Sequence, residues 1–400
     1  MSFGGTNLDQ GQAYNRRLLL EAIRVHGSLS RADLTRLTGL APQTVSNIAS
    51  TLEAAGLVTS RRRSGSSRGQ PPKDLQLNPG GGYAFGISVD KSRLFTVLLD
   101  ITGVCLDEFE DQIDALSPSS ILDKIESAVA TIHRRTPVPK KRILGAGLAM
   151  TGLTLEGNLI GLSPSSASRQ WQDFPIVRKL EIALSMPIFT DNDARAAAVA
   201  EAFHGQGRSY RNFLYVYFGV GIGGGIVSAG QPFRGSNGRA GEFGHIITEP
   251  GGKLCSCGGR GCLEQYTSIT SALEAIGCDA DENNAQNLLV EAYEARDVRL
   301  MNWIDVAASH LSTAVVILEN IFDPQAVLLG GIIAEPVLDA IVQRMLPLPR
   351  TVSSQHTAES PRIVRSGTGP KVPAMGAASL ALFDATSADL SLLLKRTASS

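Results

Sequence analysis

One histidine and three cysteines lie between residues 245 and 262 of this chain, in the run GHIITEPGGKLCSCGGRGCLE. His245, Cys255, Cys257 and Cys262 have the spacing H-x9-C-x-C-x4-C. One imidazole and three thiolates form a complete tetrahedral ligand set for zinc, and the glycines between them allow a short backbone to fold around an ion. Four protein ligands leave no position open for water, so we expect a structural zinc rather than a catalytic one.

A disulfide framework is the alternative interpretation of these cysteines. Cys255 and Cys257 are too close in sequence to bridge each other comfortably, and the chain has an odd total of 5 cysteines. Clustered thiolates also indicate a reducing compartment. The opening MSFGGTNLDQ is polar, and the longest apolar run, residues 213–227, is interrupted by glycines. We therefore expect a soluble, cytoplasmic protein without a membrane span.

The charge of the chain is divided unevenly along its length. A chain of 400 residues can form two or three domains. Residues 1–75 carry 10 Arg and Lys against 5 Asp and Glu, whereas the remainder carries 27 against 33. A basic N-terminal part on an acidic body predicts a nucleic-acid partner for that part alone.

Residues 13–54 have the pattern of a helix-turn-helix. Residues 13–26 form an apolar stripe at helical spacing, Ser30 and Asp33 form a capping box, and Pro42 suits the first turn of a third helix. Small polar side chains are left on the outer face of that third helix, where a recognition helix reads DNA: Gln43, Thr44, Ser46 and Asn47. A three-helix bundle without a DNA function uses the same apolar stripes.

The residues after the third helix favour the DNA-binding interpretation. Residues 57–59 and 74–77 resemble the two strands of a wing. The connection between them contains no acidic residue before Asp74 and carries a set of arginines: Arg61, Arg62, Arg63 and Arg68. A glycine-flanked arginine before two prolines is typical of a thin cationic segment that enters a minor groove. We therefore predict a winged helix-turn-helix that binds double-stranded DNA.

Beyond the glycine-rich break at residues 78–82, strands alternate with helices. Apolar or β-branched runs at residues 83–90, 92–100, 143–150 and 212–227 predict strands. Helical patterns lie at about residues 118–134, 174–185, 194–204, 267–276, 284–296 and 302–322. This alternation predicts a two-lobed α/β body.

The order of these motifs over essentially the whole chain closely resembles the ROK family of repressors and sugar kinases. The resemblance implies an actin-like ATPase (ribonuclease H-like) body with a zinc knuckle. It places a winged helix-turn-helix domain at 1–78, a first lobe at 79–192 completed by 376–400, and a second lobe with the zinc site at 193–375. Members with such an N-terminal domain resemble sugar-responsive transcription regulators, and members without it are typically sugar kinases.

The phosphate-binding elements of the kinase members are altered in this chain. The kinase pattern D-x-G-G-T corresponds here to a stretch with Ser88 in place of the aspartate and Asp90 and Lys91 in place of the glycines. An acidic group and added side chains would repel and crowd the phosphate oxygens. In the second glycine-rich loop the usual hydroxyl is Val220. We therefore expect a body without kinase activity.

The residues that face the sugar in the family are better retained. The resemblance assigns this role to Asn192, Asp193, Glu242, His245 and Glu264. Converging carboxylates with an amide complement the hydroxyl donors of a sugar. One departure affects the identity of the ligand: the family's P-N-L-x-x-W segment is here Pro164-Ser165-Ser166 followed by Trp171, with Arg169 between them.

The function that these residues and the resemblance imply is that of a repressor of carbohydrate uptake or catabolism genes. A sugar or sugar derivative bound between the lobes would release the repressor from its operator. A homodimer or homotetramer would present paired recognition helices to a near-palindromic site. Two alternatives remain open: an ATP-dependent sugar kinase that retains a DNA-binding domain, and a scaffold whose body is titrated by a protein partner.

Overall fold

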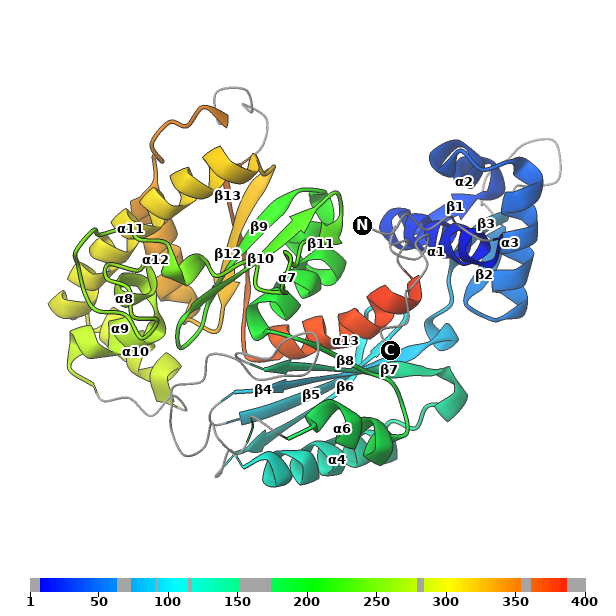
Figure 1. The fold of residues 1–400 in the computed structure, drawn as a ribbon, viewed down its shortest axis with the longest axis horizontal. Helices are drawn as coiled ribbons and strands as arrows, with labels where there is room; N and C mark the ends of the chain where they lie inside the picture. Colours follow the sequence, from blue (N-terminus) through cyan, green and yellow to red (C-terminus); the bar gives the residue numbers. More distant parts are fainter. Residues whose placement is uncertain are drawn as a thin grey trace.

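The computed structural model describes residues 8–62, 73–90, 93–113, 117–150, 171, 174–278, 284–353 and 361–386. Along the chain it contains a small three-stranded sheet followed by two five-stranded sheets. The small sheet and the helices next to it form one end of the molecule, and the two larger sheets with their helices form the rest (Figure 1).

The N-terminal domain is a three-helix bundle joined to an antiparallel sheet of order β1-β3-β2. Ser30 caps the second helix through the expected capping box with Asp33, and Gly39 ends it in the left-handed conformation at a φ of 69°. The first helix is longer than the 13–26 that the stripe predicts. The elements are α1 (Leu8–His26), β1 (Ser28–Ser30), α2 (Arg31–Thr38), α3 (Pro42–Ala54), β2 (Val58–Arg62) and β3 (Lys73–Leu77).

The first large sheet has the order β6-β5-β4-β7-β8, with β7 and β8 parallel to β4 and the other pairs antiparallel. Its outer face is covered by two helices (Figure 1). The strands are β4 (Tyr83–Val89), β5 (Arg93–Asp100), β6 (Cys105–Gln112), β7 (Ile143–Met150) and β8 (Ile188–Asp191); the helices are α4 (Pro118–Arg135) and α6 (Ile176–Leu184), with short 3-10 turns at Pro79–Gly81 and Lys140–Arg142.

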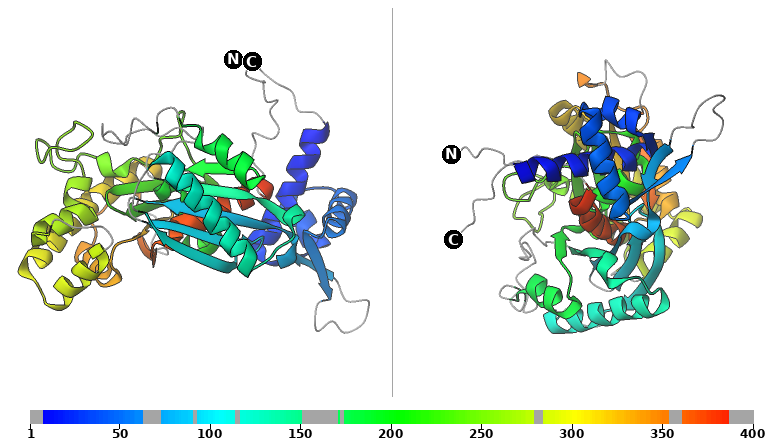
Figure 2. Two further views of the ribbon diagram at one scale, coloured as in Figure 1. Left: turned by 90° about the horizontal axis from the view of Figure 1, so that it is seen from below. Right: turned by 90° about the vertical axis from the view of Figure 1, so that its right-hand side faces the viewer.

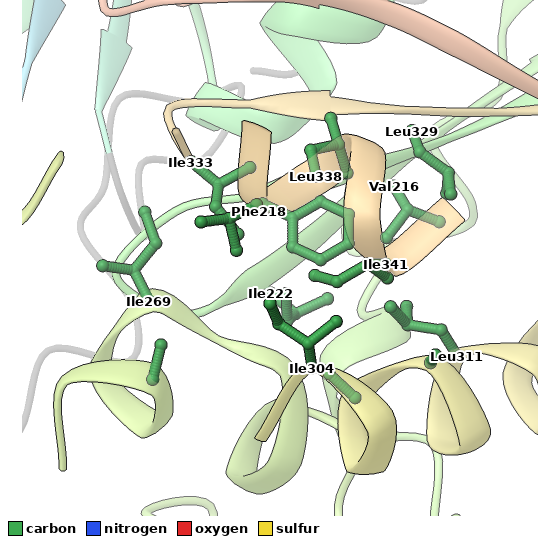
Figure 3. Close-up of a cluster of buried hydrophobic side chains, with 14 of the residues drawn as sticks. Val216, Phe218, Ile222, Ile269, Ile304, Leu311, Leu329, Ile333, Leu338 and Ile341 are labelled. Carbon is green, nitrogen blue, oxygen red and sulfur yellow. The ribbon is translucent and has the colours of Figure 1, made fainter. Parts of the chain in front are cut away.

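The second large sheet has the order β11-β10-β9-β12-β13. Its outer face packs on helices through a core of branched apolar side chains, in which Phe218 and Ile222 lie close to Ile304 and Ile341 (Figure 3). The strands are β9 (Phe213–Phe218), β10 (Ile222–Ser228), β11 (Gln231–Pro232), β12 (Ala326–Gly331) and β13 (Ile363–Thr368); the helices are α8 (Glu264–Thr267), α9 (Ile269–Ile276), α10 (Ala285–Glu294), α11 (Val298–Phe322) and α12 (Glu335–Met345), with 3-10 turns at Gln206–Ser209 and Phe243–His245.

Helices α7 (Asp193–His204) and α13 (Lys371–Thr386) lie between the two large sheets (Figure 1). They touch through small residues: a Cβ at Gly376 would lie 1.8 Å from the carbonyl oxygen of Ala196. A Cβ at Gly147 of β7 would likewise lie 1.8 Å from the carbonyl oxygen of Ala377 in α13. Each lobe is thus a sheet with helices on both faces, as the strand and helix pattern predicts for a two-lobed α/β body.

The N-terminal domain docks on the body through α1. The guanidinium of Arg24 lies 4.0 Å above the ring of Phe203 at the end of α7, and Arg17 pairs with Asp384 of α13 at 3.9 Å. From the body, Arg142 donates to the carbonyl of Ala55 at the end of α3. The domain is therefore attached to both helices that separate the lobes.

Two features of the body differ from the expectations or need comment. Strand β12, which ends at Gly331, is a buried central strand and was not among the predicted strands. Among the described residues, α11 is the one helix long and apolar enough to cross a membrane, with a mean hydropathy of 1.3. Its buried side chains, such as Ile304 and Leu311, pack in the core of the second lobe, so we interpret it as a core helix.

Candidate ligand, metal and DNA-binding sites

The structure brings the four predicted metal ligands together. The ligand atoms of His245, Cys255, Cys257 and Cys262 all lie within 4.8 Å of one another, and all three cysteines are free thiols. The Sγ atoms of Cys257 and Cys262 are 3.7 Å apart, and Nδ1 of His245 is 3.6 Å from Sγ of Cys255. A sulfur pair at 3.7 Å is far beyond the S–S bond length of about 2.05 Å, so the disulfide alternative does not apply to this pair.

These distances fit a tetrahedral metal site. A zinc ion with Zn–S bonds of about 2.3 Å and a Zn–N bond of about 2.0 Å separates two sulfurs by about 3.8 Å and a sulfur from the nitrogen by about 3.5 Å. Burial, followed by the neighbouring thiols of Cys257 and Cys255, raises the pKa of Cys262 to about 12. The donor set could therefore hold a soft or borderline cation such as zinc.

The loop around the cluster is held by backbone contacts and by one side chain that the sequence did not reveal. Cys255 N–H donates to Gly259, and the amide of Gln265 approaches Sγ of Cys255 at 3.6 Å. Gly261 has a φ of 81°, and a Cβ there would lie 1.6 Å from the carbonyl oxygen of Glu249. The glycine is required both by its conformation and by the close approach of the backbone.

The three segments that carry the predicted sugar ligands all pack against the start of β10. This strand is paired with β9 across a hairpin, and its first residue, Ile222, is followed by three glycines that have no side chain. The contacts are Ile222 N–H to the carboxylate of Glu264 (3.1 Å), Gly223 to Ala194 (2.5 Å from a built Cβ to Cβ) and Gly224 to the ring of Phe243 (2.1 Å from a built Cβ). One strand thus gathers the start of α7, the turn with Glu242 and His245, and the start of α8.

Several of the predicted sugar ligands already have a local partner. Asn192 is the N-cap of α7, and its Oδ1 accepts from Ala194 N–H at 2.9 Å, which leaves its NH₂ group for a ligand. Asp193 begins the same helix and is half-buried. Glu242 is exposed, and His245 turns Nδ1 to the cysteines, so Nε2 is the ring nitrogen that remains for another partner.

Asp191, at the end of β8 directly before Asn192, has a structural role. Its carboxylate is fully buried and pairs with Arg195 at 2.6 Å and with Arg234 at 3.6 Å. Arg234 belongs to the segment that leads to Glu242 and His245. The ion pair therefore joins two of the ligand-bearing segments. Single charged residues spaced along a sequence give no signal that they will pair, so sequence reasoning missed Arg195 and Arg234.

The two elements that correspond to phosphate-binding loops have local structural roles. Ser88 lies buried in β4, and the Asp90 carboxylate accepts the N–H of Arg93 at 2.7 Å. Lys91 lies outside the described residues, as do the segment 151–170 and Arg169 within it. In the second glycine-rich segment, Gly223 and Gly225 of β10 lack side chains, so α7 can pack closely on the sheet. A Cβ at Gly225 would lie 2.2 Å from Cβ of Ala198. Helix packing accounts for these two glycines.

The predicted DNA-binding residues that the structure describes lie on α3 and β2. Gln43 and Asn47 are exposed and hydrogen-bonded to each other at 3.0 Å, whereas Thr44 and Ser46 are half-buried. Arg61 is exposed on β2, and Arg62 ends that strand. Arg63 and Arg68 lie outside the described residues.

Comparison with known proteins agrees with this architecture. The profile of the ROK family matches residues 105–383, and that of the MarR family matches residues 15–69. The chain is 28% identical over 374 residues to the xylose repressor of Bacillus spizizenii, across 92% of this chain and 94% of the repressor.

Two solved structures show the same fold. A ROK family transcriptional regulator, homologous to the Mlc protein of E. coli, superposes with a TM-score of 0.73 at 24% identity, over 94% of this chain and 98% of that chain. The ROK hexokinase of Thermus thermophilus superposes with a TM-score of 0.61 at 27% identity, over 76% of this chain and 98% of that chain. The chain belongs to the ROK family, with a MarR-type winged-helix domain ahead of its ROK body.

Proposed function

We propose that this chain is a sugar-responsive DNA-binding repressor of carbohydrate uptake or catabolism genes. The observation that carries the proposal is the winged helix-turn-helix docked on a ROK body, in a chain similar over 92% of its length to a protein named xylose repressor. The exposed Gln43 and Asn47 of α3 would read base edges in a major groove, and Arg61 of the hairpin would contact backbone phosphate.

The sugar would bind where α7, the turn before His245 and the start of α8 meet on β10. Asn192, Asp193, Glu242, His245 and Glu264 would supply acceptors and one amide donor to its hydroxyls. Binding there releases DNA only if the sugar prefers the arrangement of the lobes that fits DNA less well. The lobe boundaries we propose are 79–192 with 376–400 for the first lobe and 193–375 for the second.

We further propose that His245 and the three cysteines hold one structural zinc ion. The ion would fix the loop between Glu242 and Glu264, because His245 belongs to both the metal cluster and the proposed sugar site. Metal loading would therefore raise sugar affinity by holding these side chains in position.

The body would not transfer phosphate, because Ser88 replaces the family aspartate and Asp90 closes its own hairpin. The similarity to a hexokinase supports one alternative function, that of an ATP-dependent sugar kinase with a DNA-binding domain. ATP turnover in the presence of D-glucose or D-xylose, abolished by Asp193→Asn, would establish that alternative. We expect no turnover above the rate of the Asp193→Asn variant.

The repressor function is tested with the full-length chain and two measurements. Selection from random duplexes should yield a near-palindromic sequence, as expected for a homodimer or homotetramer in the cytoplasm. Calorimetric titration with D-xylose, D-glucose and N-acetylglucosamine should then give heat with one of them, and that sugar should weaken binding to the selected duplex. No enriched sequence would refute the regulator, and heat without any change in DNA affinity would refute sugar control.

A further inference from the structure

Next to the outer face of α3 lies a second surface, of mixed polar and apolar side chains, that the winged-helix pattern does not include. A hollow of about 480 Å³ lies between the N-terminal half of α1 and α3. Thr44, Asn47, Ile48 and Thr51 line it from α3, one face at helical spacing, and Gln12, Ala13, Asn15 and Arg16 line it from α1. Two of the predicted base-reading residues, Thr44 and Asn47, thus share this hollow with α1.

The chemistry of the hollow fits a phosphate backbone. None of its eight described lining residues is acidic, and most are amide or hydroxyl side chains that can donate to phosphate oxygens. Arg16 and Gln12 are exposed, and Arg16 makes no ion pair with any carboxylate whose side chain the structure describes. The adjacent Arg17 instead forms an ion pair with Asp384 of the body. Arg16 is therefore a cation without a structural partner in the described part of the chain.

The arrangement of the domain places this surface beside a bound groove. A helix with its side chains is about 10–12 Å across, and the major groove of B-DNA is about 12 Å wide, so a recognition helix fills the groove. Elements that flank α3 then face the phosphates along its walls. In both views of Figure 2, α1 and the β2–β3 hairpin reach away from the domain in opposite directions, and each packs on α3.

We propose that the N-terminal half of α1 is a second DNA-contacting element, in which Arg16, assisted by Gln12 and Asn15, binds backbone phosphate on the side of α3 opposite the wing. This inference rests on the proposed DNA-binding function and adds a partner surface to it. The contact is independent of base sequence, so it supports affinity and register rather than base recognition.

The test uses the full-length chain and a fluorescein-labelled 30-base-pair duplex of mixed sequence, with fluorescence anisotropy measured over a range of salt concentrations. Binding weakens as salt rises, and each phosphate contact contributes about 0.9 to the steepness (the absolute value) of the slope of log K against log salt. Arg16→Ala should therefore reduce this steepness by about 0.9 and weaken binding about five-fold at about 0.15 M salt. Arg16→Lys should keep most of the slope, because it keeps the charge. Thermal unfolding of each variant should match that of the wild type, since Arg16 is exposed.

The matched control is Arg178→Ala, which removes an exposed charge from α6 on the outer face of the first lobe. Its slope should equal that of the wild type. If Arg16→Ala behaves like Arg178→Ala while Arg61→Ala reduces the steepness of the slope, the contact by α1 is refuted and the proposed function stands. If the wild-type chain itself shows no salt-dependent binding, the DNA-binding function fails and the contact by α1 fails with it.

Discussion

The stacking of Arg24 on Phe203 should be a measurable part of the attachment of the N-terminal domain. Arg24 comes from α1 and Phe203 from the last turn of α7, with 4.0 Å between the guanidinium carbon and the ring centre. A cation over an aromatic ring contributes about 0.5–1 kcal/mol when exposed and about 2 kcal/mol when desolvated. Phe203 is 8% exposed and Arg24 is half-buried, so we expect a coupling of about 1–2 kcal/mol.

A double-mutant cycle isolates this coupling. Arg24→Met keeps the apolar stem, and Phe203→Leu keeps an apolar side chain without the ring. The free energy of opening of the N-terminal domain is read from native-state hydrogen exchange of the buried α1 amides between Leu19 and Ile23. The two single changes should sum to more than the double change by about 1–2 kcal/mol. Additivity within about 0.5 kcal/mol would show that the stacked pair does not couple the two elements.

Three further predictions concern the body. Cys257→Ser should reduce bound zinc from one ion per chain to less than one by atomic absorption and unprotect the loop amides in hydrogen exchange; full metal content would argue against the ligand set. Burial, with Arg24 and Arg208 nearby, lowers the pKa of His204 to about 4, so the unfolded chain binds more protons between about pH 6.5 and pH 4. Stability should fall by up to roughly 3 kcal/mol as pH falls through that range, and the fall should be smaller in His204→Gln. Gly376→Ala should lower the free energy of unfolding in urea by roughly 3 kcal/mol or more, because the added Cβ would meet a backbone oxygen. In the control Gly367→Ala the added Cβ meets nothing within 4 Å, and the loss should be about 1 kcal/mol at most.

Features with a local cause could be predicted from the sequence. The capping box at Ser30, the proline at the start of α3 and the spacing of the cysteines each act over a few residues. The structure confirms the starts of α2 and α3 and brings the three cysteines together with His245. The strands β4, β5, β7 and β9 are continuous apolar runs because they are central in their sheets, where both faces are covered.

Features that depend on distant contacts were missed. Strand β6 alternates half-buried and exposed residues at a sheet edge and contains acidic side chains, so its sequence CLDEFEDQ lacks a strong strand signal. Helix α13 is apolar on all sides because it lies between two layers, and this removes the amphipathic period by which helices are recognised. Asp191 pairs with Arg234, which lies 43 positions later in the sequence, and no local pattern reveals a contact over that separation.

Helix α7 links the proposed sugar site to the N-terminal domain, and this limits where substitutions can change the sugar preference. Asn192 caps its first turn, Asp193 begins that turn, and its last turn carries Phe203, which contacts Arg24 of α1. The whole helix of 12 residues is about 18 Å long. The backbone of α7 at Ala196 packs directly against Gly376 of α13. We therefore expect the two helices to move together. Substitutions within α7 that change the proposed sugar site would therefore also change the surface on which the DNA-binding domain packs. To change which sugar the protein would bind, substitutions in the turn at Glu242 are the better starting point, because this turn does not pack against the described part of the DNA-binding domain.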